Sequence, residues 1–118
     1  MQRGYVQWYQ RGYQLPPFRF SRSPFWLRNP KHYAVHSGPE ALRHEFDAVV
    51  SQKDLYETYL PAFEALVKEA KVESVMGAYN RTNGEPCCGS KTLLLDILRD
   101  DWGFTGHVVS DCWAIMDF

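Results

Sequence analysis

The chain has 118 residues, a net charge of −1 and 45% hydrophobic residues, a composition typical of one small globular domain. So small a net charge creates no field that would attract nucleic acid, and no apolar run approaches the ~20 residues of a membrane-spanning helix. The first 30 residues lack the continuous apolar core of a secretory signal. We therefore expect neither nucleic acid nor a membrane as a partner of this chain.

The charge is distributed unevenly along the chain. Residues 1–30 contain five arginines and no acidic residue, whereas all 14 acidic residues lie in residues 31–118. Glycines and prolines interrupt the apolar pattern of the first segment, and its interleaved basic and aromatic residues leave stacking on single-stranded nucleic acid as a less favoured alternative. We expect residues 1–29 to be a lead segment that is disordered or arises from a shifted reading frame, ahead of a domain at residues 30–118.

The first half of that domain predicts short apolar strands followed by a helix. The segment 33–35 (Tyr-Ala-Val) predicts a strand, and 46–50 forms a second short apolar patch. Ser51 and the acid three residues later predict a capped helix start. Apolar residues at three- and four-residue steps continue the helix to about residue 70, with a kink or restart at Pro61, which lacks a backbone N–H.

The second half repeats the strand, loop and helix order. The segment 74–79 predicts a strand, and 80–86 predicts a loop with an Asn-Gly turn. Ser90 predicts the cap of a second helix, which glycines end before a short apolar strand, 107–109. This alternation predicts an α/β fold with parallel strands and crossover helices, a partial (β/α)8 barrel of the TIM type.

Asp111 stands where the last predicted strand ends. The carboxyl ends of barrel strands form the active face in this architecture, so an acid at that place is a candidate catalyst. Two βα units cannot close a barrel, and alone they would leave strand edges and apolar helix faces exposed. We therefore expect this chain to be a fragment of a larger catalytic domain.

The cysteines do not predict a metal site. Cys87 and Cys88 are adjacent, Cys112 lies apart, and no Cys-x-x-Cys or histidine spacing suggests zinc. Small buried or half-buried thiols are the simpler interpretation. We expect no cofactor and no metal.

Four segments carry a family resemblance, in the same order and at the same spacing as in that family: 31–40 (KHYAVHSGPE), 76–84 (MGAYNRTNG), 98–104 (LRDDWGF) and 108–111 (VVSD). With these segments the chain from Lys31 onward resembles the N-terminal catalytic barrel of glycoside hydrolase family 3, which contains β-glucosidases and β-xylosidases. Residues 1–29 do not share the resemblance, which covers a small part of a typical member.

The resemblance implies a role for each matched residue. Asp111 matches the nucleophile, which would form a covalent glycosyl-enzyme that water releases with net retention. Lys31 and His32 match the pair that hydrogen-bonds sugar hydroxyls. Tyr79 matches the tyrosine that orients the nucleophile. Taken alone, the same residues would suit a helix cap, a surface pair and a packing aromatic, respectively.

Other residues near the matched segments are weaker candidates. His36, Glu40 and Arg81 would shape the site or support its loops. Cys112 follows the nucleophile, where many β-glucosidases of the family carry tryptophan, and together with the 85–88 segment (Glu-Pro-Cys-Cys) it resembles the β-xylosidase branch. A pentose lacks the C6 hydroxymethyl group, so its pocket can be closed where a glucosidase must leave room. Trp113, one position later, is a partial substitute for the missing tryptophan.

A retaining hydrolase needs a second carboxyl group about 5–5.5 Å from the first, which serves as acid and then base. In the family this glutamate lies far downstream, usually in a second domain, and no residue here matches it. Glu40, Glu45 and Glu85 lie on predicted loops but outside the family pattern. We therefore expect the isolated chain to be inactive or nearly so.

The sequence thus favours a fragment of a retaining exo-β-glycosidase that removes terminal β-linked xylose or glucose from oligosaccharides. A β-xylosidase is favoured, and a β-glucosidase is the alternative. A non-catalytic carbohydrate-binding remnant and a product without a stable fold are the other interpretations. The partner is an oligosaccharide or glycoside, while the oligomeric state and the compartment stay open.

Overall fold

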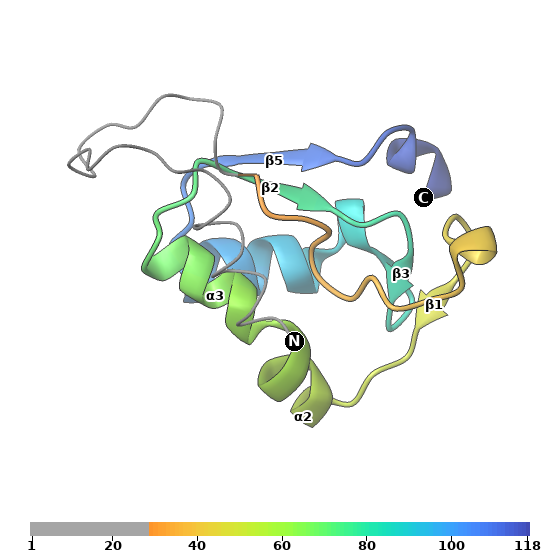
Figure 1. Ribbon diagram of the computed structural model, residues 1–118, viewed down its shortest axis with the longest axis horizontal. Helices are drawn as coiled ribbons and strands as arrows, with labels where there is room; N and C mark the ends of the chain where they lie inside the picture. The colour runs from red at the N-terminus through yellow and green to blue at the C-terminus, as the bar shows by residue number, and fades with distance from the viewer. Residues whose placement is uncertain (1–28) are drawn as a thin grey trace, which may run out of the picture.

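The computed structural model describes residues 29–118 (Figure 1), so the expectation for residues 1–28 lies outside the described residues. The elements in chain order are η1 (Glu40–Leu42), β1 (Asp47–Ala48), α2 (Gln52–Asp54), η2 (Leu55–Tyr59), α3 (Pro61–Lys68), β2 (Ser74–Gly77), β3 (Arg81–Thr82), β4 (Glu85–Pro86), η3 (Cys87–Gly89), η4 (Lys91–Asp101), β5 (His107–Ser110) and η5 (Ala114–Asp117). The predicted mixture of helices and parallel strands is confirmed.

Two parallel strands form the centre of the fold. β2 pairs with β5 from Ser74 opposite His107 to Gly77 opposite Ser110, and η4 crosses between them. Tyr33 adds a single parallel bridge to Gly77 on the other side of β2, in place of the predicted strand at 33–35. The carboxyl ends of three neighbouring parallel segments therefore lie together, because parallel strands end at the same edge of a sheet.

The helices begin where their caps predict. Ser51 Oγ accepts a hydrogen bond from the Asp54 N–H at 3.0 Å, and Ser90 Oγ accepts one from the Leu93 N–H at 3.0 Å. The helical segment from 52 to 68 restarts at Pro61, as expected for a residue without a backbone donor. Sequence patterning did not predict the wider π-type winding of η2 and η4.

The turn from η4 into β5 places the last strand. The Arg99 guanidinium donates to the carbonyls of Phe104 and Gly106, both at 2.8 Å. A Cβ on Gly106 would lie 2.2 Å from the Glu73 carbonyl oxygen, so only glycine allows β5 to approach the start of β2 this closely. This turn fixes where β5 ends and therefore where Asp111 emerges.

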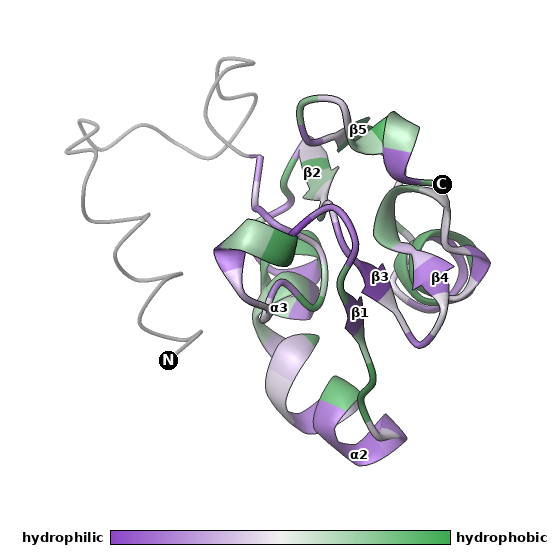
Figure 2. Ribbon diagram, turned by 90° about the vertical axis from the view of Figure 1, so that its right-hand side faces the viewer, coloured by the Kyte–Doolittle hydropathy of each residue, from purple (hydrophilic) through white to green (hydrophobic). Residues whose placement is uncertain are grey.

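The predicted loop 80–86 contains a hairpin instead. β3 pairs antiparallel with β4 and parallel with β1, which makes a second, short sheet. Asn83 and Gly84 have positive φ angles of 51° and 85°, the geometry of a tight hairpin turn. Strands of two residues carry too little periodicity to be predicted. Figure 2 shows that β1 and β3 are more polar than β5, which belongs to the other sheet.

The core lies between the central strands and the helices. Fully buried side chains include Tyr33, Leu55, Leu93 and Leu98, and β2 and β5 lie above α3 in Figure 1. The Tyr33 hydroxyl donates to the Leu93 carbonyl at 2.8 Å, so the one polar atom of this ring is satisfied. None of the helices within residues 29–118 combines the length and the apolar character needed to cross a membrane.

Candidate active site

His32 and Asp111 meet at the carboxyl edge of the central strands. His32 Nε2 lies 2.9 Å from Asp111 Oδ2, with the two side chains 25% and 15% exposed, respectively. The backbone explains this contact, because the segment before Tyr33 and β5 flank β2 on its two sides. The candidate nucleophile is therefore partly sheltered yet open to a ligand.

The second carboxylate oxygen of Asp111 is held by the main chain. The Cys112 N–H donates to Asp111 Oδ1 at 2.8 Å, while the Cys112 side chain is exposed. Each carboxylate oxygen of Asp111 therefore has at least one protein partner, which orients the carboxylate.

Tyr79, which follows β2, lies against the same carboxylate. Desolvation, the negative charge of Asp111, the nearby Cys112 and a side-chain hydrogen bond with Asp111 raise the pKa of Tyr79 above its ordinary value, although Arg43 acts in the opposite direction. The hydroxyl therefore stays protonated near neutral pH and is available to donate to Asp111.

Lys31 is exposed and His32 is partly buried. Desolvation, His36 and Lys31 together lower the pKa of His32 below 6.5, against the opposing effects of Asp111 and Glu40. His32 is therefore neutral at neutral pH, and it donates to Asp111 as the tautomer that carries its proton on Nε2. The structure thus brings all five predicted site residues, Lys31, His32, Tyr79, Asp111 and Cys112, to one edge, although their roles stay predictions.

The lowered pKa of His32 predicts a pH dependence of stability. The unfolded chain binds more protons than the folded chain between the folded pKa of His32 and 6.5, so the free energy of unfolding should fall as the pH is lowered through this window. Urea denaturation at pH 7.5 and at a series of lower values measures this slope. His32→Gln should reduce the slope of the free energy of unfolding with pH. His107→Gln, which changes an exposed histidine at the far end of β5, should leave this slope unchanged. Equal slopes in the two variants would show that His32 does not cause the pH dependence of stability.

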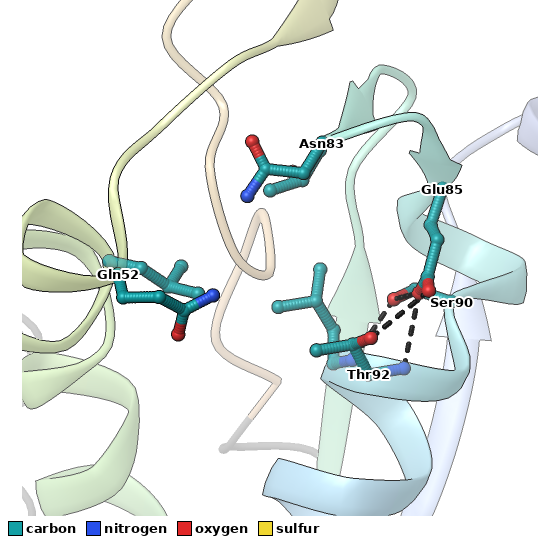
Figure 3. Close-up of a pocket in the computed structure, with 8 residues that line it drawn as sticks. Gln52, Asn83, Glu85, Ser90 and Thr92 are labelled. Atoms are coloured by element: carbon teal, nitrogen blue, oxygen red, sulfur yellow. Dashed lines mark hydrogen bonds between the residues drawn. The ribbon is translucent and has the colours of Figure 1, made fainter.

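The structure does not direct the three loop glutamates at Asp111. Glu85 accepts hydrogen bonds from the Ser90 and Thr92 hydroxyls and from the Thr92 N–H, so its carboxylate holds the start of η4 (Figure 3). These hydrogen bonds, that of Ser90 foremost, lower the pKa of Glu85. Glu40 pairs with Arg43, and Glu45 is exposed. The small pocket of about 100 Å³ beside Glu85 is lined by none of the predicted site residues.

Several polar residues near the site escaped the sequence analysis. Asn80 donates from Nδ2 to the Val35 carbonyl at 2.7 Å and so ties the His32 segment to the loop after β2. Arg43 and His44 lie against the Tyr79 ring. The matched segment 76–84, Arg81 and the Asn-Gly turn drew attention to the loop after β2, but no local pattern indicates contacts across so many residues. Among the described residues, no group of three or more histidines, cysteines and acids is placed to hold a metal ion.

Comparison with known proteins identifies one family. The family described as glycosyl hydrolase family 3 N terminal domain matches residues 26–118. A xylan 1,4-beta-xylosidase of Xylanibacter ruminicola is 61% identical over 89 residues, covering 75% of this chain and 10% of that protein.

Solved structures agree with this match. A GH3 beta-glucosidase of Bifidobacterium adolescentis superposes with a TM-score of 0.70 at 43% identity, covering 73% of this chain and 13% of that one. A GH3 exo-beta-xylosidase, XlnD, solved with a xylobiose aziridine probe, gives 0.70 at 38% identity over 74% of this chain and 12% of that one. The chain thus spans about a tenth of the length of the curated relatives that it matches.

Proposed function

The chain belongs to glycosyl hydrolase family 3, and we propose that it is part of the N-terminal catalytic (β/α)8 barrel of a retaining exo-β-glycosidase, with Asp111 as the nucleophile. The observation that carries this proposal is the convergence of His32, Tyr79 and the Cys112 N–H on the Asp111 carboxylate. A structural aspartate at a strand end would not need side chains from two other segments of the chain to orient it.

The proposed reaction has two displacements at the anomeric carbon. An oxygen of Asp111 forms a bond to this carbon as the bond to the leaving oxygen breaks, and the leaving oxygen takes a proton from an acid. Water then attacks the same carbon, gives up a proton and frees the carboxylate. Because the Cys112 N–H holds Oδ1, Oδ2 is the attacking oxygen, and His32 releases it by donating to a sugar hydroxyl instead.

The glutamates at 40, 45 and 85 leave the acid role unfilled in the described part of the chain. Glu85 is engaged at η4 and Glu40 is paired with Arg43. We therefore propose that this chain by itself hydrolyses ordinary glycosides poorly, since protonation of the leaving group is worth ~10²–10⁴-fold.

The proposed substrate is a terminal β-linked xylose, with β-linked glucose as the alternative. Cys112 places a small side chain directly after Asp111, and it is exposed beside the site. Many β-glucosidases of the family carry tryptophan at this position, so a cysteine here favours the β-xylosidase branch. The high identity to a xylan 1,4-beta-xylosidase supports this preference, whereas the structural likeness to a beta-glucosidase supports the alternative.

The test uses 2,4-dinitrophenyl 2-deoxy-2-fluoro-β-xyloside and its gluco counterpart. Dinitrophenolate leaves without protonation, so the missing acid does not prevent the first displacement, and the C2 fluorine slows the second. We expect a covalent fluoroxylosyl adduct in the intact mass of the chain, mapped by peptide sequencing to Asp111. A faster gluco adduct would select the glucosidase alternative, and sugar-dependent protection from unfolding without an adduct would select the binding remnant. If the chain shows no adduct and no sugar-dependent protection, the proposal is contradicted.

A further inference from the structure

Tyr79 lies against two cationic or polar side chains from the loop after η1. The His44 ring packs on the Tyr79 ring edge to face, with centroids 4.6 Å apart and planes at 61°. The Arg43 guanidinium carbon lies 5.1 Å from the centroid of the same ring, within the range of cation–π attraction. The aromatic ring beside Asp111 is therefore contacted by two side chains that belong to neither β2 nor β5.

His44 is itself oriented from the opposite end of the described chain. Its Nδ1 lies 2.8 Å from Asp117 Oδ2, a contact between residues 73 positions apart. The Arg43 Nε–H donates to His44 Nε2 at 3.3 Å. Since Nε2 accepts from Arg43, the His44 proton sits on Nδ1 and is donated to Asp117.

Asp117 is a fixed partner for this contact. Its side chain is 12% exposed, against 44% for His44. Its backbone carbonyl also accepts from Arg81 Nη2 at 3.4 Å, which ties η5 to the start of β3. The chain of contacts thus runs from β3 through Asp117 and His44 to the Tyr79 ring.

From this arrangement we infer that His44, anchored by Asp117, is a positioning residue that holds the Tyr79 hydroxyl against Asp111. The inference rests on the proposed role of Asp111. His44 touches neither carboxylate oxygen of Asp111, which are occupied by His32 and the Cys112 N–H. His44 acts through the Tyr79 ring. The contacts of His44 and Arg43 with this ring restrict the side chain of Tyr79, so its hydroxyl cannot easily turn away from Asp111.

The first measurement follows Tyr79 without any substrate. In the full chain labelled with ¹³C at the ζ carbon of tyrosine, Tyr79→Phe identifies the Tyr79 resonance, and its titration reports the pKa of the hydroxyl. We expect a midpoint above the ordinary 10.0 in the original chain. His44→Ala and Asp117→Ala should each move it back towards 10.0, because the ring is no longer held beside the Asp111 charge. His107→Ala, a second exposed histidine outside the contact chain, should not.

The second measurement is the rate of labelling by the dinitrophenyl fluoroxyloside. His44→Ala and Asp117→Ala should each lower the maximal labelling rate by about 10- to 100-fold, the effect of a small misplacement at the reacting centre, while half-saturation changes less than about threefold. A residue that served only the fold would lower the stability and leave the two kinetic constants of the remaining folded chain unchanged. Far-UV circular dichroism of each variant verifies folding, and the Asp117 variant stands in if the His44 variant does not fold.

The outcomes separate this inference from the proposed function. A Tyr79 midpoint that moves in both variants, with no labelling of any chain, supports the positioning role and contradicts the glycosidase. A second outcome is that the original chain is labelled, while both variants keep the original Tyr79 midpoint and labelling rate. This result overturns the positioning role and supports the glycosidase. Movement in both measurements supports both.

Discussion

Asp111→Ala should eliminate labelling by the dinitrophenyl fluoroxyloside, because no carboxylate remains to bond the anomeric carbon. With the non-fluorinated dinitrophenyl β-xyloside, we expect release of dinitrophenol to fall by about 10⁴-fold or more, in line with the loss of other covalent nucleophiles. The variant should stay folded, because the side chain of Asp111 contributes hydrogen bonds at the edge of the strands and no core packing.

Azide provides a stereochemical check on the same variant. The space left by the carboxylate lies on the face opposite the leaving group, so azide that enters there should restore dinitrophenol release and give the α-xylosyl azide by a single inversion. A β-configured azide, or labelling that survives in Asp111→Ala, would show that another residue is the nucleophile. Asp96→Asn, which changes an aspartate paired with Lys91 on η4, is the control and should be labelled at the original rate.

Leu98→Ala should have the largest effect on stability. Leu98 is fully buried on η4 in the cluster that joins this helix to Tyr33 and the central strands. Truncating a buried leucine removes its transfer free energy and leaves a cavity, which together cost about 2–5 kcal/mol. In a domain whose total stability is about 5–15 kcal/mol, such a loss removes a large share of the stability.

The matched control for this change lies on the same helix. Leu95 is 48% exposed, so Leu95→Ala carries the same change in helix propensity without a cavity, and we expect an effect within about 0.5 kcal/mol. Urea denaturation followed by circular dichroism gives both values. A chain that shows no cooperative transition at all would instead support the interpretation of a product without a stable fold.

Local signals in the sequence determined most of the element order. Ser51 and Ser90 start helices because their hydroxyls satisfy backbone donors only three residues away, and Pro61 restarts a helix because it has no donor of its own. The apolar segment before Asp111 predicted the last strand, and the matched segments predicted the family. Each of these signals is contained within a few consecutive residues, so no knowledge of the rest of the fold is needed to interpret it.

Only the tertiary structure decided how the site is held together. His44 and Asp117 are 73 positions apart and meet only because η1 and η5 are brought to the same edge of the central strands. The hairpin of β3 and β4 follows from pairing with β1 and the strict geometry of Asn83 and Gly84, not from periodicity. Hydrogen bonds between residues far apart in the sequence cannot be predicted from the residues next to either partner. The candidate nucleophile was therefore predictable from the sequence, whereas the contacts that surround Tyr79 were not.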